Sequence, residues 1–190
     1  MKNNTNIKIS SKLPQTKESI FSVMSALARE HKAINLSQGF PNFPVSEELI
    51  ALVSKYMREG MNQYAPAIGI PELRHVLAKK IENLYSHTVD VDQEITITAG
   101  ATEALFSSIT ALVKEGDEVM IFEPAYDSYV PAIRLSGGIP ISVQLKGPDY
   151  KIPWEEVKRK LSFKTRMIVI NTPHNPCGTI LDDEDIRQLK

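Results

Sequence analysis

The chain has 190 residues, with 22 lysines and arginines against 23 aspartates and glutamates, so its formal net charge is -1. This balance lacks the basic excess that nucleic-acid binding requires. No apolar run approaches the roughly 20 residues needed to cross a bilayer, and the polar N-terminus has no signal-like apolar stretch. A single cysteine, Cys177, excludes an internal disulfide and a cysteine-rich metal site. We therefore expect a cytoplasmic protein with no nucleic acid, membrane or metal among its partners.

Apolar residues recur at helical spacing along the chain, and from residue 94 onwards these segments alternate with short apolar strands. The helical segments are, in chain order, residues 16–30, 46–57, 71–84, 102–114, 126–135, 154–161 and 182–190. The strands are residues 94–99, 118–123, 139–145 and 166–171. This alternation predicts a three-layer α/β/α domain with a mostly parallel sheet.

The last helical segment, residues 182–190, begins with acidic residues and meets no terminating glycine or proline. A doubly wound sheet that is cut within a crossover helix would leave apolar surface uncovered. We therefore expect the chain to be a fragment and its fold to be incomplete.

Ligands of open α/β sheets bind beyond the carboxyl ends of the strands, and three turns here follow predicted strands. The first turn is TAGATEA, residues 98–104. There Gly100, Ala101 and Thr102 would present backbone N–H groups and a hydroxyl at a helix N-terminus, which suits a phosphate. The pattern is neither G-x-G-x-x-G nor a P-loop, and a plain tight turn also explains it.

The other two turns carry an aromatic ring and an amide. Tyr126 in EPAYDSY would stand at the same sheet edge, either against a planar ring or as a half-buried packing residue. In NTPHNPCGT, Pro173 and Pro176 restrict the residues before them and would hold the Asn175 amide in place. A fixed amide can donate to a phenolate oxygen, although Asn-Pro turns are often purely structural. His174 is interpreted as a turn histidine, with a substrate contact as the alternative.

Two loops outside the predicted sheet complete the set of candidate segments. LSQGFPNFP contains Gly39, and NQYAPAIGIPELR contains Tyr64. On the residues alone, an ordinary Gly–Pro turn and a core or interface aromatic explain them. Cys177 has no neighbours in the sequence that would activate its thiol.

Taken in order, LSQGFPNFP, NQYAPAIGIPELR, TAGATEALF, GDEVMIFEPAYDSY and NTPHNPCGT resemble successive blocks of the class I pyridoxal-phosphate aminotransferases. The segment SIFSVMSALAREHKAINLSQGFP is similar to the methionine and kynurenine branch, and above all to its methionine-preferring bacterial members. The resemblance covers residues 12–190. It implies the fold type I large domain, with residues 1–45 as an N-terminal arm and small-domain segment. Residues 46–190 would be the N-terminal part of the pyridoxal-phosphate-binding large domain.

The resemblance also implies roles for residues that match the family's motifs. Ala101 and Thr102 would bind the cofactor phosphate, with Gly100 making the turn. Tyr126 would stack on the pyridine ring. Asn175 would hydrogen-bond the phenolic oxygen and help to hold the substrate carboxylate.

Three further roles come from the resemblance. The Gly39 backbone would meet the substrate carboxylate, and Phe21 would line the side-chain pocket. Tyr64 would reach the phosphate of the neighbouring subunit, which implies a homodimer with shared active sites. Phe21, Phe40 and Tyr64 suggest an amino acid with a long apolar or aromatic side chain, such as methionine, phenylalanine or kynurenine.

The family's catalytic lysine, its pyridine-nitrogen aspartate and its carboxylate-binding arginine should follow Lys190, so no catalytic residue is assigned here. Lys164 stands in a superficially similar setting but precedes the Asn175 motif, and it is interpreted as a solvated loop lysine. We expect an aminotransferase that acts on an amino acid and a 2-oxo acid, with this chain alone inactive. The alternatives are a pyridoxal-phosphate carbon–sulfur lyase and a non-catalytic remnant of the fold.

Overall fold

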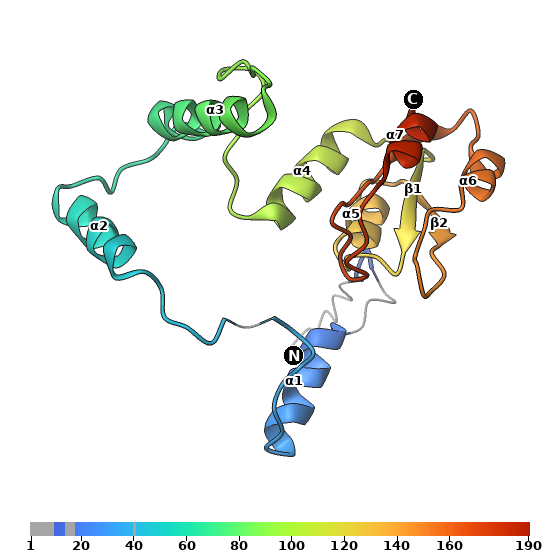
Figure 1. Ribbon diagram of the computed structural model, residues 1–190, viewed down its shortest axis with the longest axis horizontal. Helices are drawn as coiled ribbons and strands as arrows, with labels where there is room; N and C mark the ends of the chain where they lie inside the picture. Colours follow the sequence, from blue (N-terminus) through green and yellow to red (C-terminus); the bar gives the residue numbers. More distant parts are fainter. Residues whose placement is uncertain (1–9, 14–17, 40) are drawn as a thin grey trace, which may run out of the picture. The chain divides into compact units, whose positions relative to one another are not determined.

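The computed structural model describes residues 10–13, 18–39 and 41–190 (Figure 1). Internal contacts divide the chain into two compact units. One is Glu18–Ala99, and the other is Gly100–Lys190 together with the described residues before Glu18. The division between residues 45 and 46 that the sequence predicts concerns the domains of the complete fold, and it stays a prediction.

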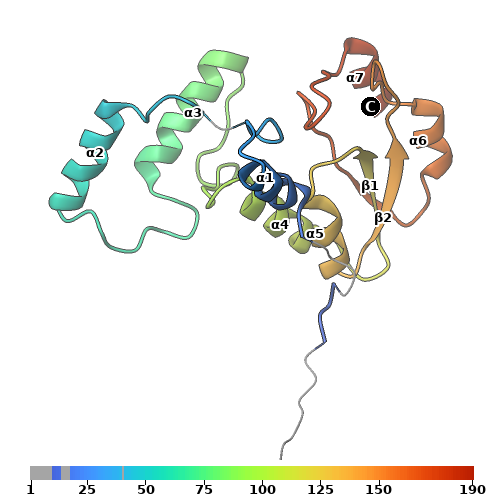
Figure 2. The same cartoon turned by 90° about the horizontal axis from the view of Figure 1, so that it is seen from below.

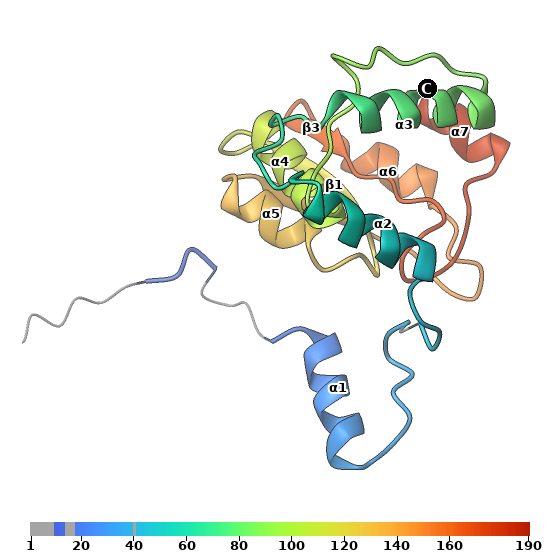
Figure 3. The ribbon, with the colours of Figure 1, turned by 90° about the vertical axis from the view of Figure 1, so that its left-hand side faces the viewer.

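The unit Gly100–Lys190 contains, among the described residues, a three-stranded parallel sheet in the order β2-β1-β3. The strands are β1 (Glu118–Glu123), β2 (Ile139–Gln144) and β3 (Thr165–Ile168). The central strand β1 pairs with β2 without a break, and its register against β3 shifts between Glu118 and Val119. Figure 3 shows β3 beside β1. Because all three strands run parallel, their carboxyl ends meet at one edge of the sheet.

Helices cover both faces of this sheet (Figure 2). The helices of this unit are α4 (Ala101–Leu112), α5 (Tyr129–Leu135), α6 (Trp154–Lys160) and α7 (Asp183–Leu189). Helices α4 and α5 pack on one face, and α6 packs on the other. This arrangement confirms the predicted three-layer α/β/α architecture with a parallel sheet.

The alternating side chains of β1 form the centre of both cores. Val119 and Ile121 pack with Ile109 of α4 and Ile133 of α5. On the other face, Met120 and Phe122 pack in the second buried cluster, together with Val143 and Val157. A strand covered on both faces has no solvent-facing side to keep polar, and this explains the apolar run VMIF.

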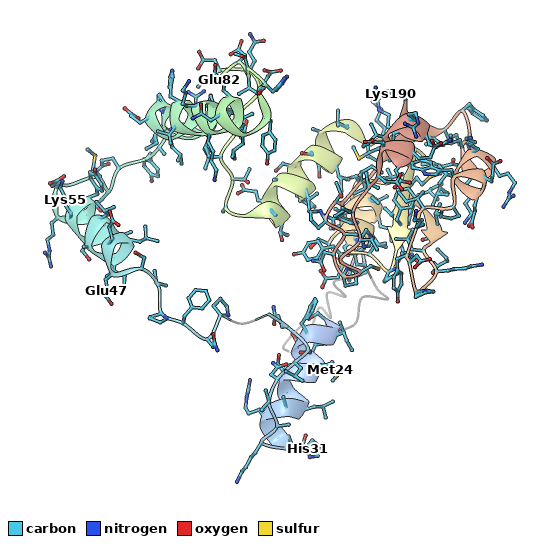
Figure 4. The ribbon with its side chains drawn as sticks, viewed as in Figure 1. Met24, His31, Glu47, Lys55, Glu82 and Lys190 are labelled. Atoms are coloured by element: carbon cyan, nitrogen blue, oxygen red, sulfur yellow. The ribbon has the colours of Figure 1, made fainter. Side chains whose placement is uncertain are left out.

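The unit Glu18–Ala99 contains α1 (Ile20–Glu30), α2 (Glu47–Arg58) and α3 (Pro71–Tyr85). Neither α1 nor α2 has a buried residue. Figure 4 shows their side chains, with Met24 labelled on α1 and Lys55 on α2. The large apolar side chains left exposed on α2 are Leu49, Ile50, Leu52, Val53, Tyr56 and Met57. These apolar faces are available for packing against further polypeptide.

The structure corrects three predicted elements. Residues 94–99 form no strand. The Ile97 backbone N–H donates to the Ile68 carbonyl at 3.0 Å, but a strand requires a series of such bonds to a neighbouring strand. The described residues of Glu18–Ala99 contain no strand with which this segment could pair. The helix predicted from residue 126 begins at Tyr129. The strand predicted over 166–171 ends at Ile168. The first two residues of the helix predicted over 16–30 lie outside the described residues.

Candidate functional site

The first candidate turn leads into α4, as predicted, but the strand expected before it is absent. Gly100 is the N-cap residue with φ 87°, in the left-handed region that favours glycine. Nothing lies within 4 Å of the place where a Cβ would stand. Ala101 and Thr102 follow in the first turn, where backbone N–H groups have no acceptor within the helix. The helix dipole adds a partial positive charge there, so this terminus suits a phosphate.

Tyr126 meets this helix terminus through its hydroxyl. The Oη of Tyr126 and the Oγ1 of Thr102 lie 3.2 Å apart. The half-buried Tyr126 ring packs edge-on against Tyr129, with ring centroids 5.8 Å apart and an interplanar angle of 73°. Burial, and secondly the neighbouring Tyr126, raise the pKa of the Tyr129 phenol. The structure therefore brings together two residues that the sequence places 24 positions apart.

Asn175 lies in a tight turn that follows β3. The Asn175 backbone N–H donates to the Asn171 side-chain oxygen at 2.6 Å, and the His174 N–H donates to the Thr179 carbonyl at 2.7 Å. These bonds hold the backbone on both sides of Asn175, which is itself exposed. Because β3 and β1 are parallel neighbours, the turns that carry Asn175 and Tyr126 leave the same edge of the sheet.

The same turn contributes to a cavity of about 250 Å³ that sequence reasoning did not anticipate. The lining residues include Phe122, Leu145, Tyr150, Ile170, Asn171 and His174. The ring Nδ1 of His174 is buried and has no hydrogen-bond partner among the described residues. Burial lowers the pKa of His174, against the opposing effect of a hydrogen bond with the Phe122 backbone. Burial therefore disfavours the charged form of the imidazole, a property that the motif NTPHNP does not reveal.

Two reactive side chains of this unit are unsuited to catalysis at the site. Burial raises the pKa of the Cys177 thiol, so the thiol stays protonated near neutral pH. Lys164 is exposed in the loop before β3, at the amino end of the strand and away from the carboxyl edge. Both observations agree with the interpretation of these residues from the sequence.

The remaining candidates belong to the unit Glu18–Ala99 and lie on three separate segments. Phe21 is half-buried on α1, and Gly39 is exposed in the loop that follows this helix. Tyr64 is fully exposed between α2 and α3. Phe40 lies outside the described residues. The roles of these residues stay predictions.

Two other kinds of site are absent from the part of the chain that the structure describes. None of its helices combines the length and apolar character that crossing a membrane requires. It also contains no group of three or more histidine, cysteine, aspartate or glutamate side chains placed to hold a metal ion.

Comparison with known proteins decides the family. Residues 31–190 match the sequence model of the family described as aminotransferase class I and II. The chain belongs to this family. It is 50% identical over 179 residues to a methionine aminotransferase of Escherichia coli, a match that covers 94% of this chain and 46% of the relative. It is 36% identical over 177 residues to human kynurenine–oxoglutarate transaminase 3, covering 86% of this chain and 38% of the relative.

Solved structures agree with the sequence comparison. The crystal structure of YbdL from Escherichia coli, described as a methionine aminotransferase, superposes with a TM-score of 0.92 at 49% identity. This match covers 96% of this chain and 48% of that protein. N-succinyldiaminopimelate aminotransferase from Mycobacterium tuberculosis superposes with a TM-score of 0.89 at 32% identity, over 96% of this chain and 48% of that one. The predicted family and fold are thereby confirmed, and the chain spans about half the length of these relatives.

Proposed function

We propose that the protein to which this chain belongs is a pyridoxal-phosphate-dependent aminotransferase. It would exchange the amino group between an amino acid and a 2-oxo acid. The observation that carries the proposal is the contact between Thr102 and Tyr126 at the N-terminus of α4. This contact supports the proposal because a helix end that would suit an anion lies beside an aromatic ring, in a chain that belongs to an aminotransferase family.

The residues at this edge fit pyridoxal phosphate. The N–H groups of Ala101 and Thr102, with the Thr102 hydroxyl, would bind the phosphate, and the left-handed Gly100 leaves room for it. Tyr126 would cover one face of the pyridine ring. The Asn175 amide would donate to the phenolic oxygen. When bound, the cofactor supplies an electron sink for negative charge at the substrate α-carbon.

Three residues would contact the substrate. The Gly39 backbone N–H and the Asn175 amide would orient the substrate carboxylate, and Phe21 would line the side-chain pocket. We propose methionine or an aromatic amino acid as the donor, because relatives at 50% and 36% identity are named for methionine and kynurenine. A long, mostly apolar side chain suits a pocket lined by aromatic carbon.

The active protein would be a cytoplasmic homodimer in which Tyr64 reaches the phosphate of the neighbouring subunit. Two observations support a larger assembly. The chain spans about half of its relatives, and the apolar side chains of α2 are exposed. Burying such faces would be a driving force for packing against the other half of the fold and against a second subunit. The cofactor-binding lysine would lie in that other half.

Borohydride reduction of the full-length, cofactor-loaded protein tests this function. The expected result is one lysine labelled with the cofactor, in polypeptide beyond Lys190, as mapped by peptide mass spectrometry. Absence of any labelled lysine would show the proposal to be wrong. The 190-residue chain alone should form no ketomethylthiobutyrate from methionine and a 2-oxo acid, and measurable formation would contradict its proposed inactivity.

The reaction type needs a separate assay. The full-length protein should convert methionine only when a 2-oxo acid is supplied, since transamination requires an acceptor. Release of pyruvate and ammonia from cystathionine, without any 2-oxo acid, would show a carbon–sulfur lyase instead.

A further inference from the structure

We propose that the Tyr126 hydroxyl is a positioning group for Thr102, so that recognition of the cofactor phosphate depends on the hydroxyl of Tyr126 as well as on its ring. This inference rests on the proposed function. It starts from the 3.2 Å separation between the Tyr126 Oη and the Thr102 Oγ1. Stacking on a planar ring needs only the aromatic face, so the hydroxyl contact is a second and separate property of this side chain.

The direction of the hydrogen bond follows from proton counting. Either hydroxyl can be the donor when the pair is considered alone. An ionised phosphate presents acceptor oxygens, and threonine has one hydroxyl proton, so Thr102 must donate that proton to the phosphate. Tyr126 must then donate to the Thr102 oxygen. Donation to that oxygen polarises the threonine O–H bond and fixes its direction, so the bond to phosphate becomes stronger.

Packing holds both partners at this distance. Tyr126 lies against the buried cluster of α4, α5 and β1, and its ring is supported edge-on by Tyr129. Thr102 lies in the first turn of α4, a helix that packs directly against α5. The fold therefore presents the two hydroxyls to one another before any ligand arrives, which limits the entropy lost when the phosphate binds.

The test compares a phosphorylated probe with one that lacks the phosphate. Pyridoxamine 5′-phosphate and pyridoxamine have the same ring, and neither can form a covalent bond with a lysine amine. Dissociation constants are measured by calorimetry for the full-length protein. For Tyr126→Phe we expect about a three- to tenfold loss of affinity for pyridoxamine 5′-phosphate, the range for one hydrogen bond, and less than about a twofold change for pyridoxamine.

Matched variants separate positioning from general damage. Tyr129→Phe removes a hydroxyl from the neighbouring ring, whose hydroxyl is not the one that meets Thr102, and should leave the ratio of the two constants unchanged. Thr102→Ser keeps the hydroxyl and should also keep the ratio. Tyr126→Phe added to Thr102→Val should weaken phosphate binding no further than Thr102→Val alone, because the tyrosine acts through the threonine.

Two results would overturn the inference while leaving the proposed function intact. One is an equal loss of affinity for both probes in Tyr126→Phe, or no loss for either. The other is additive losses in the Thr102→Val and Tyr126→Phe pair. Failure of the unaltered protein to bind pyridoxamine 5′-phosphate at all would instead overturn the proposed function, and the inference with it.

Discussion

The indole Nε1 of Trp154 donates to the Oδ1 of Asp185 at 2.8 Å and so joins α6 to α7. The other carboxylate oxygen of Asp185 accepts the Asp182 backbone N–H at 3.0 Å. In return, the Asp182 side chain accepts the Asp185 backbone N–H, which completes a capping box. One carboxylate therefore both starts α7 and attaches it to the neighbouring helix.

Replacing Asp185 should release α7. Asp185→Ala removes the capping bond and leaves the Trp154 indole N–H without its partner, so we expect a loss of about 1–3 kcal/mol in the free energy of unfolding. Urea denaturation checks the size of the effect, and hydrogen exchange should show the α7 amides losing protection. Asp183→Ala, in the same helical turn but with an exposed side chain, is the control. An equal effect of the two variants would contradict the dual role of Asp185.

Arg74 should contribute far more to the free energy of unfolding than Asp92, the carboxylate with which it pairs. Its side chain is 6% exposed, whereas that of Asp92 is 82% exposed. The Arg74 guanidinium donates to the Gly69 and Val91 carbonyls at 3.2 and 2.6 Å. It therefore connects the loop before α3 to the loop after α3. Arg74→Met should cost about 2–4 kcal/mol because both carbonyls lose their partner.

Asp92→Asn is the matched control for Arg74→Met. It should cost less than about 1 kcal/mol, because the Asp92 side chain is 82% exposed and solvent screens its interaction with Arg74. Urea denaturation of both variants gives the comparison. A loss for Asp92→Asn as large as that for Arg74→Met would mean that the ion pair, and not the backbone contacts, stabilises this segment.

Truncation of two isoleucines, one in the core around β1 and one exposed, should have very different effects on the free energy of unfolding. Ile121 is fully buried, and Ile180 is 72% exposed. Ile121→Ala should lower the free energy of unfolding by about 2–5 kcal/mol, since β1 and the helices α4 and α5 that pack on this face cannot fully collapse into the space that the side chain leaves. Ile180→Ala should change it by less than about 0.5 kcal/mol. Thermal and urea unfolding of the two variants side by side would show whether the difference exists.

Acid should weaken the protein through His174. Burial holds the pKa of this imidazole below its ordinary value of 6.5, so the unfolded chain takes up the proton first as pH falls. The contribution of the neutral ring is therefore fully present above pH 6.5 and is lost as pH falls through the lower pKa of the folded state. His174→Gln should flatten the fall in urea midpoint between about pH 7 and pH 5.

Other charged groups near His174 could also contribute to the pH dependence of stability, so the unaltered protein is compared with His174→Gln. Asp149, Lys151 and Asp185 also line the cavity, and they are present in both proteins, so their contributions cancel in the difference. Identical pH profiles for the unaltered protein and His174→Gln would show that His174 does not titrate with folding.

Much of the fold follows from local pattern. The sequence predicts residues 118–123 as a strand, and β1 has these bounds. A short apolar run is typical of a buried strand, and Pro124 ends it because proline has no N–H to donate to a neighbouring strand. Pro71 at the start of α3 and the acidic residues that begin α7 likewise determine helix starts locally. The ordered motifs also identified the family, which the match over residues 31–190 confirms.

Tertiary structure alone decided which residues meet. A strand exists only where another strand pairs with it, so residues 94–99 look like a strand in the sequence and form none here. Thr102 and Tyr126 come within 3.2 Å because α4 packs on α5 over the sheet, and neither turn shows this by itself. The partial burial of His174 likewise depends on tertiary contacts, because Phe122 of β1 lines the same cavity and its backbone forms a hydrogen bond with the imidazole. Periodicity, caps and turn residues act over a few neighbouring positions, whereas the site requires segments distant in the sequence to be held together by a common core.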